Sequence, residues 1–150
     1  MTRLRQVALV VVAGSLLLVG LWATIAPRSF YDDFPGMGRV WVAVDGPYNE
    51  HLVRDVGSLN LALAFVAVLA LITGSTLLAR AAGGAALIYG VPHLLYHATH
   101  LDPYDTDDQV ALIVSLPWLV DDVVRSSSSV ARTEKLYVPG VRTGEVQLQL

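Results

Sequence analysis

Long runs without a charged residue constrain this chain more than any other feature. Residues 6–26 contain no Asp, Glu, Lys or Arg over 21 positions, and residues 56–79 contain none over 24. A helix needs about 20 apolar residues to cross the ~30 Å hydrocarbon core of a bilayer, because it rises about 1.5 Å per residue. The chain is 54% hydrophobic and only 15% charged over 150 residues, so its composition is that of an integral membrane protein.

We expect an all-α fold, an integral membrane four-helix bundle that forms one domain over residues 1–125. The predicted spans cover about residues 6–26, 50–79, 81–101 and 107–124. The fourth is the weakest, because only 12 uncharged residues separate Asp108 from Asp121, and ~18 Å of helix falls short of the hydrocarbon core. A re-entrant or surface-lying helix is the alternative for this block. We expect residues 126–150 to form a polar, mobile cytoplasmic tail.

The first apolar run admits a second interpretation, a secretory signal peptide. Residues 24–26 (Thr-Ile-Ala) are tolerable before a cleavage site. However, the uninterrupted apolar run is longer than the ~7–15 residues usual for a signal-peptide core. We therefore favour an uncleaved first helix, flanked by Arg3 and Arg5.

The distribution of basic residues predicts the orientation. If the N-terminus lies inside, seven basic residues are cytoplasmic and three are external, which agrees with the positive-inside rule. The cytoplasmic set is Arg3, Arg5, Arg80, Arg125, Arg132, Lys135 and Arg142, and the outer set is Arg28, Arg39 and Arg54. The acidic loop 102–108, which has no basic residue, then falls outside. We expect a multi-pass protein of a bacterial plasma membrane with both termini in the cytoplasm.

The composition also excludes several function classes. The chain has no cysteine, which rules out disulfides, thiolate zinc sites, cysteine-ligated iron–sulfur clusters and cysteine nucleophiles. It has no Gly-rich phosphate loop and no serine nucleophile motif. A net charge of −3 and the lack of a basic-aromatic surface predict no nucleic-acid partner. Any redox chemistry would therefore need a bound cofactor or metal.

Three histidines at the outer end of the third span are the strongest candidates for a site. His93, His97 and His100 are spaced i, i+4, i+7, which predicts that their rings share one face of a helix. Titratable side chains in an apolar span are expensive to desolvate and usually mark a site. If spans two and three form a tight antiparallel hairpin, His51 and Asp55 reach the same outer level.

This grouping predicts a metal site, and without thiolates the donor set suits zinc, copper or iron. Its residues are His93, His97, His100, His51 and Asp55. A haem or a quinone is the other cofactor hypothesis. The alternative is a structural network in which the histidines hydrogen-bond neighbouring side chains or carbonyls, and this is the more frequent role for such a histidine pair. Asn60, deeper in the second span, is expected to hydrogen-bond across helices.

Two stretches of the chain carry a family resemblance. They are PYNEHLVRDVG at residues 47–57, followed by LNLALA at 59–64, and YGVPHLLYH at 89–97. They resemble uncharacterised small four-helix membrane proteins of actinobacteria, which are distantly similar to the DoxX-like group. The resemblance covers about residues 6–120 and implies a four-helix bundle in the plasma membrane. The DoxX name is associated with membrane oxidoreductase assemblies, which implies a quinone-linked or partner-subunit role.

The leading functional hypothesis is an accessory membrane protein or a subunit of a membrane assembly, such as a redox assembly, with a His/Asp site at its outer face. Its expected partners are the lipid bilayer and other membrane subunits. One alternative is a small proton- or solute-coupled carrier. This is disfavoured because, besides His93 and Asn60, few polar residues fall deep in the spans. The other alternative is a membrane enzyme that uses a histidine-ligated metal or haem.

Overall fold

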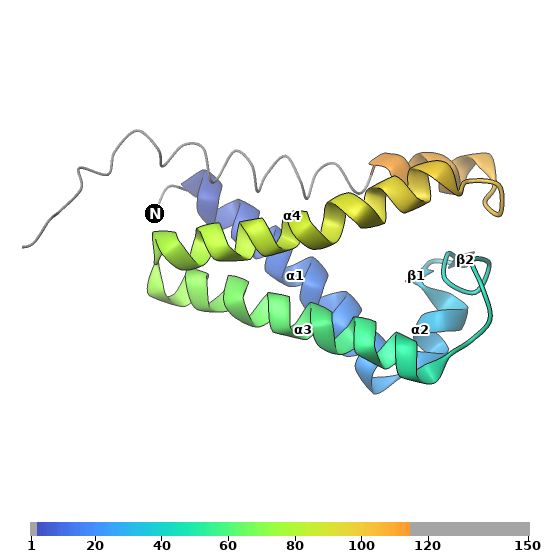
Figure 1. Cartoon of the computed structure of the whole chain (residues 1–150), viewed down its shortest axis with the longest axis horizontal. Helices are drawn as coiled ribbons and strands as arrows, with labels where there is room; N and C mark the ends of the chain where they lie inside the picture. Colours follow the sequence, from blue (N-terminus) through green and yellow to red (C-terminus); the bar gives the residue numbers. More distant parts are fainter. Residues whose placement is uncertain (1–2, 115–150) are drawn as a thin grey trace, which may run out of the picture.

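The computed structural model describes residues 3–114 and is mostly helical. Its elements are α1 (Arg3–Ile25), α2 (Pro27–Asp33), β1 (Pro35–Gly36), β2 (Arg39–Val40), α3 (Glu50–Thr73) and α4 (Thr76–Thr99). Residues 106–114 are helical as well, so the fourth predicted span begins within the described part of the chain. The rest of that span, to residue 124, and the predicted tail 126–150 lie outside the described residues. Figure 1 shows α2 and the β1–β2 hairpin at the end of α3 that is remote from the α3–α4 turn.

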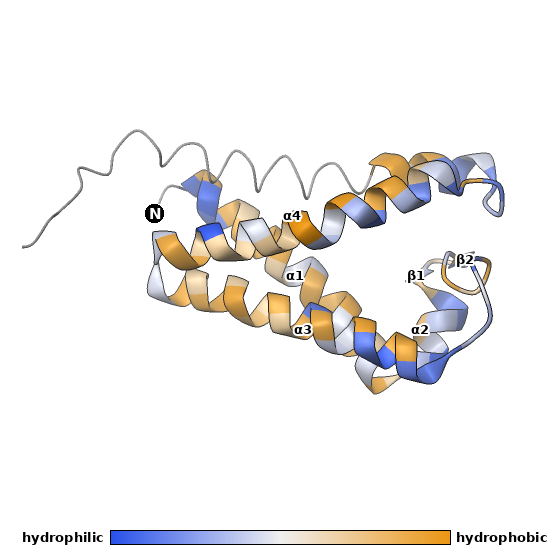
Figure 2. Cartoon of the chain, viewed as in Figure 1, coloured by the Kyte–Doolittle hydropathy of each residue, from blue (hydrophilic) through white to orange (hydrophobic). Residues whose placement is uncertain are grey.

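Two of these helices, α1 and α3, are long and apolar enough to cross a membrane. Their mean hydropathies over the most apolar stretch are 2.4 and 2.3. The equally long α4 is not among them, because its glycines, Pro92 and its histidines dilute the apolar residues. Figure 2 shows the apolar colour along α1 and α3, and hydrophilic residues gathered at α2, at the start of α3 and beyond α4. We call this hydrophilic end the polar end of the molecule.

The turn between α3 and α4 lies at Gly74 and Ser75, earlier than the predicted span bounds. The predicted boundary at residues 79–81 is wrong, because α3 ends at Thr73 and α4 begins at Thr76. Gly74 adopts the left-handed conformation, with φ of 66°, that terminates a helix without Cβ strain. The Ser75 side chain accepts a hydrogen bond from the Leu78 N–H at 3.3 Å and so caps the next helix. Two residues therefore suffice to reverse the chain into the tight antiparallel hairpin expected from the sequence.

The side chain of Arg5 ties α1 to this turn. Its Nη1 donates to Thr76 Oγ1 at 3.1 Å, and its Nη2 donates to the Gly74 carbonyl at 3.2 Å. Arg5 is only 6% exposed. A guanidinium at a helix C-terminus interacts favourably with the carbonyls that lack a partner there. The end of the molecule opposite the polar end is thus fixed by a cation.

A seam of small residues joins α1 and α3. The shared core includes alanines that are completely buried, namely Ala23, Ala64, Ala67 and Ala70. A Cβ added to Gly57 would lie 2.8 Å from the Thr24 backbone nitrogen and 3.1 Å from the Ala23 carbonyl carbon. Gly20 meets the Leu61 side chain and backbone in the same way, at 2.9–3.0 Å. These contacts bring the two backbones close together, which is how helices associate in lipid.

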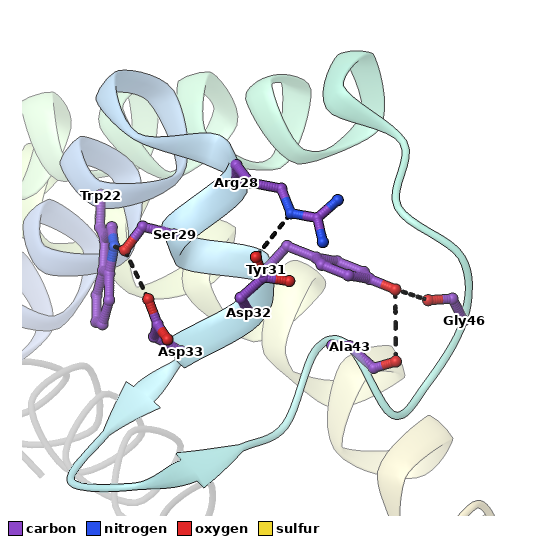
Figure 3. A network of polar contacts seen from close by, with 8 residues as sticks. All are labelled: Trp22, Arg28, Ser29, Tyr31, Asp32, Asp33, Ala43 and Gly46. Atoms are coloured by element: carbon purple, nitrogen blue, oxygen red, sulfur yellow. Dashed lines mark hydrogen bonds and ion pairs between the residues drawn. The ribbon is translucent and has the colours of Figure 1, made fainter.

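The segment between α1 and α3 contains the short helix α2 and the β1–β2 hairpin. Pro27 occupies the first turn of α2, where its missing N–H is harmless. The rings of Trp22, Phe30 and Phe34 pack edge-on or tilted at centroid distances of 4.7–6.0 Å. Figure 3 shows a polar relay beside them, from the Trp22 indole to Ser29 at 3.3 Å and on to Asp33 at 2.9 Å. These contacts could not be predicted from the sequence, because they join residues that lie on different elements.

The Gly57 contact gives a stability prediction. Gly57→Ala forces backbone to move at Ala23 and Thr24, and overpacking of this kind costs ~1–3 kcal/mol. That exceeds the gain of up to ~1 kcal/mol from the higher helix propensity of alanine. Thermal unfolding of the detergent-solubilised protein should therefore show a lower midpoint.

The matched control is Gly84→Ala on α4, where an added Cβ meets nothing within 4 Å. This variant should unfold at the same temperature as the wild type or higher. An unchanged midpoint for Gly57→Ala would contradict the close approach of α1 and α3.

Candidate functional site

The three histidines of α4 do not share one face as predicted. His93 and His97 do meet, with ring centroids 4.6 Å apart and ring planes at 82°. The helix ends at Thr99, however, and His100 is its C-cap with non-helical backbone angles. The His100 ring stacks on Tyr96 at 4.2 Å, and its Nδ1 lies 2.9 Å from the Tyr96 carbonyl oxygen. His100 is thus turned back onto Tyr96 of its own helix.

His97 is the buried member of the pair. It is 9% exposed, whereas His93 is exposed. The His97 ring lies against Tyr96 and Tyr104, at centroid distances of 5.5 and 6.2 Å. Its Nδ1 is buried and has no hydrogen-bond partner within residues 3–114. Buried polar atoms are nearly always hydrogen-bonded. An unpaired buried nitrogen therefore points to a partner outside residues 3–114.

The carboxylate that faces these histidines is Asp45, a residue that sequence reasoning missed. Asp45 lies in the connection between β2 and α3, and its Oδ1 accepts a hydrogen bond from the Tyr96 hydroxyl at 3.1 Å. The same carboxylate acts electrostatically on His93 and His97 and on the Tyr104 phenol. We call Asp45, His93, Tyr96, His97 and Tyr104 the outer cluster.

The predicted partners His51 and Asp55 do not join this cluster. They pair with each other one turn apart at the start of α3, with His51 Nε2 and Asp55 Oδ2 3.4 Å apart, and both side chains are exposed. Figure 1 shows why they are separated from the α4 histidines: α3 and α4 diverge from their turn, and α2 with the hairpin lies between their far ends. Within residues 3–114, no group of three or more His, Cys, Asp or Glu side chains is arranged to hold a metal ion. The predicted five-residue metal site is therefore not assembled in the described structure.

Asp108 holds the connection that carries Asp45. The Asp108 carboxylate forms an ion pair with Arg39 and accepts a hydrogen bond from the Trp41 indole at 2.9 Å. The Tyr104 hydroxyl donates to the Trp41 carbonyl at 2.9 Å. We call these contacts among Arg39, Trp41, Tyr104 and Asp108 the outer lock. It joins the hairpin to the segment after α4, and the charged partners make its hydrogen bonds stronger than neutral ones.

The outer cluster continues inward along α4. The Tyr89 ring stacks on His93 with a centroid distance of 5.7 Å. Asn60 of α3, which is 2% exposed, places its Nδ2 3.5 Å from the Tyr89 hydroxyl. The predicted cross-helix contact of Asn60 is thus confirmed, although its shorter hydrogen bond is to Val56 of its own helix, at 2.8 Å. Polar groups therefore follow α4 from the polar end to the level of Asn60.

Comparisons with known proteins do not identify the chain. No family model, no curated protein and no solved structure matches it. The resemblance to DoxX-like proteins therefore remains a prediction.

The Tyr104 phenol provides a pH test of the outer cluster. Burial, reinforced by the nearby Asp45 carboxylate, raises the pKa of Tyr104 to about 12, compared with about 10 for an unfolded tyrosine. The neutral phenol is therefore favoured in the folded state, and its contribution to stability is complete below pH ~10 and is lost as the pH rises towards ~12. The hydrogen bond to Asp45 also raises the pKa of Tyr96, so ultraviolet absorbance of the solubilised protein should show a late tyrosine ionisation to which both phenols contribute.

Tyr104→Phe should reduce this late step by one tyrosine and lower the stability at neutral pH by ~1 kcal/mol, because the hydrogen bond to Trp41 is lost. Tyr48→Phe, as the control, should leave the late step in place. A titration that is identical in the wild type and Tyr104→Phe would contradict the buried position of this phenol.

Proposed function

We propose that this chain is a small multi-pass protein of a bacterial plasma membrane that acts as an accessory protein or subunit of a membrane assembly. The observation that carries the proposal is the outward apolar surface of α1 and α3. Only 33% and 28% of their most apolar stretches are buried. Val10 and Leu18 of α1 and Phe65 and Ile72 of α3 are 57–77% exposed. In a soluble protein the core helices are mostly buried, whereas lipid is the natural solvent for such faces.

The packing of α1 supports its retention as a membrane helix instead of its removal as a signal peptide. Its buried positions form the seam against Gly57 and the alanines of α3, and its Arg5 caps the α3–α4 turn. Removal of α1 would uncover the backbone of α3 at Gly57 and leave Gly74 without this contact. The helix is therefore treated as the first span.

The distribution of charge along the described helices supports a cytoplasmic N-terminus. Arg3 and Arg5 begin α1 and Arg80 lies in the second turn of α4, so these cations gather at the α3–α4 turn. At the polar end each arginine is balanced by a carboxylate. The ion pairs there are Arg28–Asp32, Arg39–Asp108 and Arg54–Glu50. By the positive-inside rule the turn faces the cytoplasm and the polar end faces outward.

An accessory role is favoured over a carrier because the polar side chains do not continue through the whole length of the helices. The polar side chains along α4 lead from the outer cluster to Asn60 of α3. The next buried positions of α3 are Ala64, Ala67 and Ala70, each completely buried. Alanines offer no proton acceptor or ion ligand, so this packed inner half supports an outer-facing site and not a transmembrane route.

Cysteine labelling tests the membrane topology directly, because the chain contains no cysteine of its own. Met37→Cys places the only thiol at the tip of the hairpin, where Met37 is 94% exposed. This variant should react in intact cells with a maleimide that cannot cross membranes.

The matched variant is Thr2→Cys, just before α1, which should react only after the cells are opened. Labelling of Thr2→Cys in intact cells, or recovery of the protein in the soluble fraction, would contradict the proposed topology. The accessory role is tested by native electrophoresis of membranes solubilised in mild detergent. The tagged chain should migrate with further subunits, and migration only as the free chain would contradict that role.

A further inference from the structure

An apolar groove between α3 and α4 adjoins the outer cluster. It has a volume of about 380 Å³ and is lined by Leu59, Leu63, Ala85, Ile88 and Tyr89. Small-molecule sites commonly have volumes of ~300–1,000 Å³. Since α3 and α4 run antiparallel from their turn, Leu63 and Ala85 lie nearer the turn, and Leu59 and Tyr89 lie nearer the polar end. The groove is therefore apolar at depth and ends at a phenol on its outer side.

Hydrogen-bonding groups continue from this phenol towards the polar end. Tyr89 stacks on His93, and His93 meets the buried His97. The His93 side chain is exposed beside Tyr89, whereas the Nδ1 of His97 behind it is buried. An occupant of the groove that extends outward would thus meet, in order, apolar side chains, the Tyr89 hydroxyl and the exposed His93 imidazole. This sequence of environments fits an amphiphile.

The charged side chains at the polar end indicate which headgroup the amphiphile would carry. The three arginines of the polar end are engaged in ion pairs with Asp32, Asp108 and Glu50, so an anionic head would find them already neutralised. Asp45 is exposed, and one of its oxygens accepts the hydrogen bond from Tyr96. A carboxylate accepts several hydrogen bonds and so retains capacity for a cation. The pattern fits a head that combines acceptor oxygens with an ammonium group.

We propose that the groove and the outer cluster together bind one zwitterionic aminophospholipid of the outer leaflet. An acyl chain occupies the groove, the ester and phosphate oxygens face Tyr89 and His93, and the ammonium group lies at Asp45. Tyr89 and Tyr96 are separated by ~10 Å of helix, which is enough to span one headgroup layer of ~5–7 Å. The inference rests on the proposed function, because it requires α3 and α4 to lie in a bilayer with the polar end outward.

Native mass spectrometry of the full chain tests this binding. The protein is incubated in nanodiscs of equal parts phosphatidylethanolamine and phosphatidylglycerol and then released. The wild type should retain one phosphatidylethanolamine per chain, in preference to phosphatidylglycerol. Ala85→Trp and Ile88→Trp fill the groove and should reduce this retention about tenfold, which corresponds to ~1.4 kcal/mol.

The control is Leu77→Trp, which introduces the same side chain on the same helix at a residue that is 74% exposed and does not line the groove. It should retain lipid as the wild type does. Asp45→Asn should abolish the preference for ethanolamine over glycerol heads while the total retention persists. These two variants separate the acyl-chain contribution from the headgroup contribution.

Three results would overturn the inference. They are equal retention by the wild type and both groove variants, a preference that Asp45→Asn leaves unchanged, and retention of a species without a phosphate group, such as a quinone. The labelling of Met37→Cys and Thr2→Cys reports the topology independently. Correct labelling without selective lipid retention removes only the lipid site, whereas incorrect labelling removes the proposed membrane topology itself.

Discussion

The close contact between α1 and α3 is the interaction on which the rest of the structure depends. Lipid tails are as apolar as leucine, so helices in a bilayer gain little from apolar burial and rely on close packing. Gly57 against the backbone at Thr24, and Gly20 against Leu61, provide that packing. The outer end is reinforced by Arg54, whose guanidinium donates to the Thr24 carbonyl. Because the α3–α4 turn is only two residues long, fixing α3 also fixes where α4 begins.

The outer lock then positions the segment that carries Asp45 next to the end of α4. A single carboxylate, Asp108, binds both Arg39 and Trp41. These two donors on one charged acceptor hold the hairpin against the segment after α4. Residues 41–49 therefore lie next to the end of α4. Asp45 lies in this segment, where it accepts the hydrogen bond from Tyr96. The outer cluster is thus a product of tertiary contacts near water, where charged groups are least costly to hold.

The sequence predicted the long helices better than the site. Apolar length alone predicted α1 and α3, because the bilayer sets a minimum that few other structures meet. The sequence marks the α3–α4 turn at Gly74 and Ser75 as well as at Arg80, and the structure uses the first two as C-cap and N-cap, so only the predicted span boundary at residues 79–81 was wrong. The i, i+4 spacing correctly paired His93 with His97.

The partner of the histidines could not be predicted in the same way. Asp55 was the predicted partner because a tight antiparallel hairpin would bring it to the same outer level as the histidines. The structure shows that the helices diverge, since α2 and the hairpin lie between their outer ends. Asp45 takes the place of Asp55 from a segment without helical or strand periodicity. No local pattern could indicate this, because its position depends on the distant contact between Arg39 and Asp108.

In the proposed membrane topology, the change in polarity along α3 and α4 places the candidate site on the outer side. A titratable group in lipid costs less the nearer it lies to the interface, and the histidines occupy the outer half of α4 while alanines fill the buried positions of inner α3. His97 is the exception that needs a reason, because it is buried with an unsatisfied nitrogen among the described residues. It packs against His93, whose exposed ring stacks on Tyr89 at the edge of the groove, so in the proposed topology a molecule that enters from the outer leaflet meets His93 first.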